Sequence, residues 1–176
     1  MSGLADREFA KQKGEVSFLV GQGRTAEVLR NLCLHVAKSG EDQWEKLAKR
    51  IKILFGVELA RPEFIIERGE IVMDYRDSSG IDLDLSCSGR GVQQTLLLLA
   101  YMAVNPGAVL LLDEPDAHLE ILRQRQIYRI LSESATLQGS QVIAASHSEI
   151  VLNEAAERDV VVAFVGKPHR IDDRGS

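Results

Sequence analysis

An uninterrupted apolar run followed by two acids constrains this chain more than any other feature. Residues 108–112 read Ala-Val-Leu-Leu-Leu, and Asp113, Glu114 and Pro115 follow directly. A run without polar alternation is typical of a strand buried on both faces, as in a parallel sheet. Ligands of open parallel sheets bind beyond the carboxyl ends of the strands, so the two acids are placed to face a ligand.

The segments after this strand predict an α/β fold of the βαβ type. We expect a helix over about 117–135, a strand over 141–145, an amphipathic helix over 149–157 and a strand over 159–165. Strands and helices that alternate in this way form parallel strands flanked by helices.

The residues before the core strand have a different pattern. Short runs with turn residues between them predict an antiparallel stretch, with strands at 64–69, 70–76 and 81–85. A strongly apolar helix is expected over 92–104, and the Asn-Pro-Gly sequence behind it ends that helix.

Two amphipathic helices are predicted in the first sixty residues. One runs over 26–38 with Thr25 as its N-cap, and Gly40 is expected to end it in a left-handed conformation. The other runs over about 43–55 and ends at Gly56. Its apolar residues form one stripe that faces a core. The stripe consists of Trp44, Leu47, Ile51 and Leu54.

By its patterning the chain divides into an N-terminal helical segment over 1–60, an α/β core over 61–172 and a tail over 173–176. The first sixty residues carry 10 basic and 8 acidic side chains, and the formal charge of the whole chain is −5. Neither value shows the basic excess of a nucleic-acid surface, so nucleic acid would be a partner only through a larger, intact protein.

Membrane and secreted proteins are excluded as classes. The longest apolar run, 96–104, is nine residues, whereas a membrane span needs roughly 20. The N-terminus lacks the pattern of a signal peptide. Cys33 and Cys87 lie outside any CxxC pattern and away from histidines at zinc-ligand spacing. They are therefore interpreted as reduced thiols of a cytoplasmic protein.

Phosphate chemistry is the function that the two acids favour. The carboxylate of Asp113 suits Mg²⁺, which prefers hard oxygen ligands and keeps much of its water shell. Glu114 is placed to orient or deprotonate a water that attacks a phosphate. The alternative is that both acids simply end a strand and face water.

A serine- and glycine-rich sequence opens the apolar helix. Residues 86–91 read Ser-Cys-Ser-Gly-Arg-Gly. Glycines let a phosphate approach backbone N–H groups, and a helix N-terminus attracts anions. The serine hydroxyls would add donors and Arg90 would add a cation. The alternative is a plain glycine turn that caps a core helix.

A histidine follows the strand at 141–145. Its sequence, Ser146-His147-Ser148, should lie beside Asp113 and Glu114 because the two strands are expected to be neighbours. The imidazole could then donate to a phosphate oxygen or hold the attacking water. The alternative is a capping turn in which the histidine is structural.

In this order the motifs resemble those of ABC-type ATPases. Residues 86–93 look like the signature motif, 110–115 like the Walker B strand with its catalytic glutamate, 116–119 like the D-loop and 146–147 like the switch histidine. The variant of the signature and the run Glu-Pro-Asp-Ala-His-Leu-Glu are most similar to the stand-alone ATPases of the OLD type and their SMC-like relatives.

The resemblance implies the C-terminal portion of a P-loop NTPase that uses ATP and Mg²⁺. In such families a head-to-tail dimer sandwiches two ATPs between the P-loop of one subunit and the signature of the other. Mapped here, Asp113 would hold the Mg²⁺ shell, Glu114 would be the general base and His147 would contact the γ-phosphate. Asp116 and His118 would couple the two sites. The residues that would face the partner's nucleotide are Ser86, Ser88, Gly89, Arg90, Gly91 and Gln93; which serine faces the phosphate stays open.

The Walker A motif, G-x-x-x-x-G-K-[ST], is missing from these 176 residues. Lys167 follows Gly166, but Pro168 comes next and Val161 stands where the first glycine belongs. We therefore expect a missing N-terminal Walker A lobe, and an isolated chain that binds ATP weakly, hydrolyses essentially none and self-associates through an uncovered sheet edge and face.

Two other functions follow from the same residues. A non-catalytic, ATPase-derived scaffold or regulatory module is the competing interpretation, and the retained acids and histidine argue against it. The intact protein could also be a nuclease, as OLD-type chains often continue into a nuclease domain, but nothing after Asp173 supports this. The ATPase interpretation requires residues 86–94, 113–114 and 146–147 to converge around the terminal phosphate.

Overall fold

Contacts divide the chain into two compact units, residues 1–108 and 109–176, and each is described by itself. The boundaries predicted at residues 60 and 172 rest on motifs and not on compactness, and they stay a prediction. A computed structural model describes residues 8–21, 28–117, 119–165 and 167–170.

The elements of the first unit are β1 (Glu8–Phe9), α1 (Lys13–Gly21), α2 (Leu29–Ser39), α3 (Glu41–Phe55), β2 (Glu58–Leu59), β3 (Glu63–Ile65), β4 (Glu70–Val72), β5 (Asp74–Arg76), β6 (Asp82–Asp84), a 3₁₀ turn (Leu85–Cys87) and α4 (Arg90–Val104). Those of the second unit are β7 (Val109–Asp113), α5 (Ile121–Gln138), β8 (Gln141–Ala145), α6 (Glu149–Ala156), β9 (Val162–Val165) and β10 (Lys167–Arg170).

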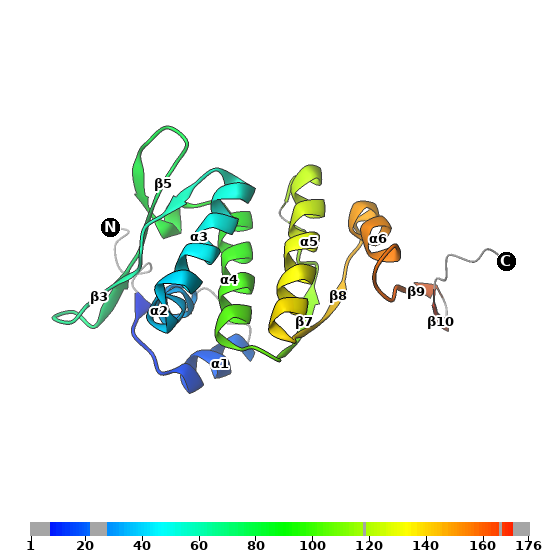
Figure 1. Ribbon diagram of the computed structural model, residues 1–176, viewed down its shortest axis with the longest axis horizontal. Coiled ribbons are helices and arrows are strands. Elements are labelled where there is room, and N and C mark those ends of the chain that lie inside the picture. The colour runs from blue at the N-terminus through cyan, green and yellow to red at the C-terminus, as the bar shows by residue number, and fades with distance from the viewer. Residues whose placement is uncertain (1–7, 22–27, 118, 166, 171–176) are drawn as a thin grey trace. The chain divides into compact units, whose positions relative to one another are not determined.

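The core of the first unit lies between α2, α3 and α4, which contact one another and lie side by side in Figure 1. The predicted stripe of α3 is confirmed, because Trp44, Leu47, Ile51 and Leu54 are all buried. Leu96 and Ala100 of α4 are fully buried. Burial of these apolar side chains is the main stabilising contribution to the unit.

Two small antiparallel sheets accompany these helices, in the strand orders β1-β4-β3 and β2-β5-β6. The strand predicted over 70–76 is divided at Met73, since β4 pairs with β3 whereas β5 pairs with β2 and β6. The Met73 side chain is buried and its carbonyl accepts a hydrogen bond from the Leu85 amide. The strand predicted over 64–69 ends at Ile65, because a turn follows it.

The helix ends follow the predictions in part. Gly56 ends α3 in the left-handed region, with φ of 71°. Gly40 ends α2 with φ of 151° and ψ of 152°, which is an extended region that favours glycine and not the expected left-handed helical one. Val28 occupies the N-cap of α2 without a capping side chain, and Thr25 lies outside the described residues.

The second unit contains the predicted strand–helix–strand core. β7 and β8 are parallel, with Val109 opposite Gln141 and Asp113 opposite Ala145, and α5 contacts β8 (Figure 1). The expected continuation as a third parallel strand is wrong for the described residues. β9 pairs with β10 in an antiparallel arrangement instead, with Val165 opposite Lys167.

One face of the β7–β8 pair is uncovered. The apolar run by itself predicted a strand buried on both faces, which is wrong here, whereas the missing Walker A motif predicted an uncovered sheet face, which agrees with the exposure observed. Leu110 is buried, whereas Leu111 is 76% exposed. Val109 and Ile143 are exposed as well. Side chains alternate along a strand, so these three residues lie on one face and Leu110 on the other. We call this exposed face, formed by Val109, Leu111 and Ile143, the apolar sheet face.

Candidate functional site

An acidic turn ends β7 beside the end of β8. The Glu114 amide donates to the Ala145 carbonyl at 2.9 Å and extends the parallel pairing by one residue. Glu114 has a φ of 45°, which is uncommon for a residue with a side chain. The Ala117 amide then donates to the Glu114 carbonyl at 3.0 Å. The turn delays the following helix, so α5 begins at Ile121 and not near residue 117.

His147 lies next to this turn, where the order of the strands predicts it. Its Nε2 atom is 3.6 Å from Oε1 of Glu114. That separation is too long for a hydrogen bond, and the imidazole is 94% exposed. Both side chains are therefore available to a third group between or beside them.

A pocket of about 430 Å³ opens at this place, and its lining includes Glu114, Asp116, Gln124, His147 and Glu149. Asp116 is buried, and its Oδ1 atom has no hydrogen-bond partner among the residues that the structure describes. A buried carboxylate oxygen without a partner is costly, and such groups concentrate at functional sites. The pocket thus joins the predicted Walker B, D-loop and histidine elements within one unit.

A hydrogen bond between Gln124 of α5 and Ser148, the N-cap of α6, joins two sides of the pocket lining. Sequence analysis did not predict this pair. The Ser148 hydroxyl donates to Oε1 of Gln124 at 2.7 Å and accepts from the Val151 amide as the N-cap of α6. The Gln124 amide group donates to the Leu119 carbonyl at 3.1 Å. The cap was visible as a serine before a helix, whereas Gln124 has no local signal.

Ion pairs join α6 to α5. Glu154 is 3% exposed, and its carboxylate contacts Nε of Arg129 at 2.5 Å and Nε of Arg125 at 2.8 Å. The hydrogen bond from Arg129, helped by the charge of Arg125, lowers the pKa of Glu154. Tyr128 donates a hydrogen bond to Asp159; burial, followed by this bond, raises the pKa of the Tyr128 hydroxyl. These contacts set where α6, and hence His147, can lie.

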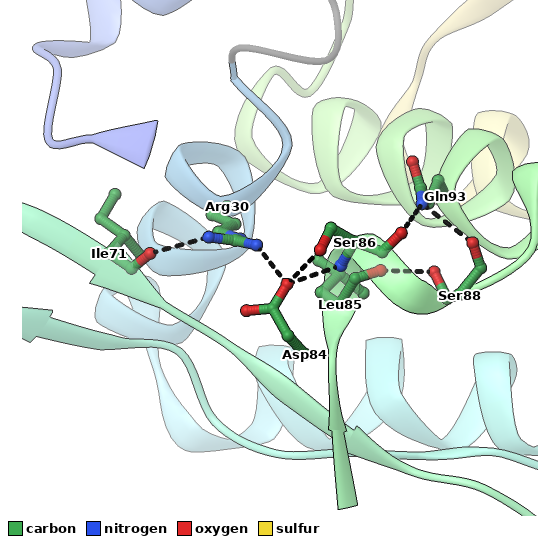
Figure 2. Close-up of polar contacts among 7 residues, drawn as sticks. All are labelled: Arg30, Ile71, Asp84, Leu85, Ser86, Ser88 and Gln93. Carbon is green, nitrogen blue, oxygen red and sulfur yellow. Dashed lines mark hydrogen bonds and ion pairs between the residues drawn. The ribbon is translucent and has the colours of Figure 1, made fainter. Parts of the chain in front are cut away.

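The serine–glycine loop of the first unit has its own polar network, drawn in Figure 2. The Ser86 hydroxyl donates to Oδ1 of Asp84 at 2.6 Å, and the Ser86 amide donates to the same oxygen at 2.8 Å. The buried Ser88 hydroxyl donates to the Leu85 carbonyl at 2.7 Å. Gln93 returns from α4 and donates to the carbonyls of Ser88 and Ser86. Each serine proton is thereby directed to an acceptor inside the loop.

The end of this loop is open to solvent. Gly89 is the N-cap of α4, and Arg90 begins the helix two residues earlier than predicted. Gly89 and Arg90 are exposed. The first amides of a helix lack intrahelical acceptors and attract anions. Gly91 belongs to this first turn.

The site residues thus fall into two groups. The second unit brings Glu114, Asp116 and His147 together at the pocket, whereas Asp113, at the end of β7, is not among its lining residues. The first unit holds residues 86–93 in the serine–glycine loop and the first turn of α4. The two units are described separately, so the expected convergence of both groups around a phosphate stays a prediction. His118 lies outside the described residues.

The residues present fit a magnesium ion that is shared with a nucleotide. Within the described part of the chain no three His, Cys, Asp or Glu side chains gather as a metal cage. Mg²⁺ is usually held by one or two carboxylates together with substrate phosphates and waters, so a cage is not required. The exposed Asp113 carboxylate, at the end of β7, offers such a ligand.

The family model described as "AAA domain, putative AbiEii toxin, Type IV TA system" matches residues 28–153, well over half of the chain. The chain belongs to this family. No curated protein matches the chain significantly. The family match includes both groups of site residues and α2 and α3.

Solved structures of SMC head domains share the fold of this AAA-domain chain. An SMC ATPase studied for ATP-driven dimerization and DNA-stimulated activation is 16% identical, with a TM-score of 0.55 over 73% of this chain and 82% of that one. The SMC head of Thermotoga maritima is 21% identical, with a TM-score of 0.53 over 88% and 52%. The Smc head of Pyrococcus furiosus, bound to the C-terminal domain of ScpA, is 14% identical, with a TM-score of 0.58 over 91% and 40%.

The resemblance to ATPases of this kind is therefore confirmed by the match to an AAA-domain family, and the likeness to SMC heads is one of fold. The chain spans about half of the length of the Thermotoga head and less of the Pyrococcus one. The closer assignment to the OLD type stays a prediction. In the described residues no helix has both the length and the apolar character to cross a membrane.

Proposed function

We propose that this chain is the signature and Walker B portion of an ATP-hydrolysing module. The observation that carries the proposal is the 3.6 Å approach of His147 to Glu114 at the carboxyl end of a parallel strand pair. A carboxylate and an imidazole in this position, at the mouth of a pocket, suit the placement of a water against a phosphate.

In this proposal Glu114 accepts the proton of the attacking water and His147 donates to an oxygen of the γ-phosphate. Asp113 would hold the water shell of Mg²⁺, and the ion, when bound, would neutralise phosphate charge. The rate gain comes mainly from positioning and from stabilisation of the charge that develops on the phosphate oxygens.

The serine–glycine loop faces a nucleotide held by a second subunit, in a head-to-tail dimer. Because the protons of Ser86 and Ser88 already have acceptors, the donors for that nucleotide are the amides of Gly89, Arg90 and Gly91, together with the Arg90 guanidinium. The hydrogen bonds of Ser86, Ser88 and Gln93 stabilise the conformation of the loop. Asp116, with its unpartnered oxygen, and His118 couple the two sites across the dimer.

The phosphate-binding loop comes from another segment, either of a longer form of this protein or of a partner, because no G-x-x-x-x-G-K-[ST] occurs in the 176 residues. The direct test is to co-express the chain with a segment that carries this motif, starting with the product encoded upstream of Met1, and to measure phosphate release from Mg-ATP.

Glu114→Gln should lower turnover of such a complex by about 100-fold or more, as for the loss of a general base. Glu133→Gln, on the exposed surface of α5, is the matched control and should leave turnover unchanged. The isolated chain should release no phosphate. Turnover by the isolated chain contradicts the proposal, because the chain would then need no phosphate-binding loop from another segment. Equal turnover by the complex with and without Glu114 also contradicts the proposal and favours the scaffold function.

A further inference from the structure

A buried arginine from a distant helix reaches the base of the serine–glycine loop. Arg30 lies on α2, and its side chain is 9% exposed. Its Nη2 atom donates to Oδ1 of Asp84 at 2.6 Å, and Nη1 donates to the Ile71 carbonyl of β4 at 3.4 Å (Figure 2). The planar guanidinium can serve two acceptors at once, which an ammonium group does less well.

The same carboxylate oxygen of Asp84 accepts hydrogen bonds from Arg30 and from Ser86. Oδ1 of Asp84 accepts from Arg30, from the Ser86 amide and from the Ser86 hydroxyl. Asp84 is the N-cap of the 3₁₀ turn that leads into the loop. Its side chain is 41% exposed, so without the arginine water would compete for this oxygen and the carboxylate could rotate away.

We infer that Arg30 is a positioning residue for the serine–glycine loop and that it acts through the charge and orientation of Asp84. The inference rests on the proposed function, in which this loop meets a nucleotide of the partner subunit. It adds that α2 is tied to the nucleotide-facing loop by one charge-assisted hydrogen bond. A shift of α2 would therefore change the conformation of the serine–glycine loop. In the same way, a ligand bound to the loop would change the position of α2.

The pair Arg76–Asp82 offers a matched control. It is also an arginine–aspartate pair of the first unit, with bonds of 2.8 Å and 2.9 Å, but both side chains are exposed. It joins β5 to β6, and within the described part of the chain neither side chain hydrogen-bonds to residues 84–93. Loss of this pair should leave the loop unchanged.

The first measurement is amide exchange of Ser86 by NMR on the full 176-residue chain. Arg30→Met should speed the exchange of the Ser86 amide by about tenfold or more, as for the loss of a hydrogen bond to a charged group. Arg30→Lys keeps a cation beside Asp84 and should restore most of the protection, even where urea unfolding shows lowered stability. Arg76→Met should leave Ser86 exchange as in the wild type. If Arg30→Met does not fold, Asp84→Asn takes its place and should speed the exchange in the same way.

Equal Ser86 exchange in wild type and Arg30→Met, or in the Met and Lys variants, overturns the inference, because Arg30 would then contribute to packing alone. The second measurement is phosphate release by the complex described above. Arg30→Met should lower turnover by about tenfold. Turnover that falls with Glu114→Gln and not with Arg30→Met defeats this inference and leaves the proposed function intact. Turnover that is insensitive to Glu114 defeats the proposed function.

Discussion

Truncation of one buried isoleucine of α3 tests whether the packing of the first unit is as described. Ile51 is fully buried, whereas Ile53, two residues further on, is 64% exposed. Ile51→Ala removes three buried carbon groups, each worth about 0.8 kcal/mol of transfer free energy. The cavity left behind raises the loss to about 3 kcal/mol or more. Ile53→Ala should change the free energy of unfolding by no more than about 0.5 kcal/mol, because the better helix propensity of alanine offsets the small burial lost.

The assay is urea unfolding followed by the fluorescence of Trp44. The chain has one tryptophan, and it is buried in the same stripe as Ile51, so its emission reports on the first unit alone. With a urea dependence of about 1–3 kcal/mol per molar, the midpoint of Ile51→Ala should fall by about 1 M or more relative to Ile53→Ala. A difference between the two variants below about 1 kcal/mol would refute the assigned faces of α3.

Three further predictions concern the second unit. Because the pKa of Glu154 is lowered below its ordinary value of 4.5, the carboxylate stabilises the fold above that pH and the contribution is lost as the pH falls through the lowered pKa. Amide protection of α6 should therefore drop in acid, and Glu154→Gln should show weaker protection at pH 7 without that acid step. Leu111→Ser on the apolar sheet face should reduce self-association, measured by light scattering, more than Leu122→Ser on α5, where the leucine is slightly more exposed. A wild-type chain that is monomeric at every concentration would contradict this. Ser148→Ala should destabilise the first turn of α6 by about 1 kcal/mol through the lost cap, and unchanged amide exchange there would show that the cap is dispensable.

Local patterns predicted those parts of the fold that depend on residues near in sequence. The stripe of α3 follows from apolar spacing, and Gly56 ends that helix because it adopts a positive φ. The approach of His147 to Glu114 follows from two parallel strands that end at the same edge. In each case the signal and the structure it specifies lie within a few residues or one βαβ unit.

The features that sequence reasoning missed depend on what packs against a segment. The missing Walker A motif predicted an uncovered sheet face, but the apolar run does not reveal that this face carries Leu111 and not Leu110, because cover comes from other elements. The division of one predicted strand at Met73 is decided by pairing with strands elsewhere. Arg30 carries no local sign of its bond to Asp84, which is 54 residues away.

The backbone of Glu114 has a consequence for anyone who engineers this protein. Among the described residues it is the non-glycine position with a positive φ, and a side chain there costs on the order of 1 kcal/mol. A stability-guided redesign would therefore choose glycine at this position first. The glycine variant would be more stable but would lack the side chain of the candidate general base. Thermal stability alone would therefore be a misleading criterion for selecting improved variants.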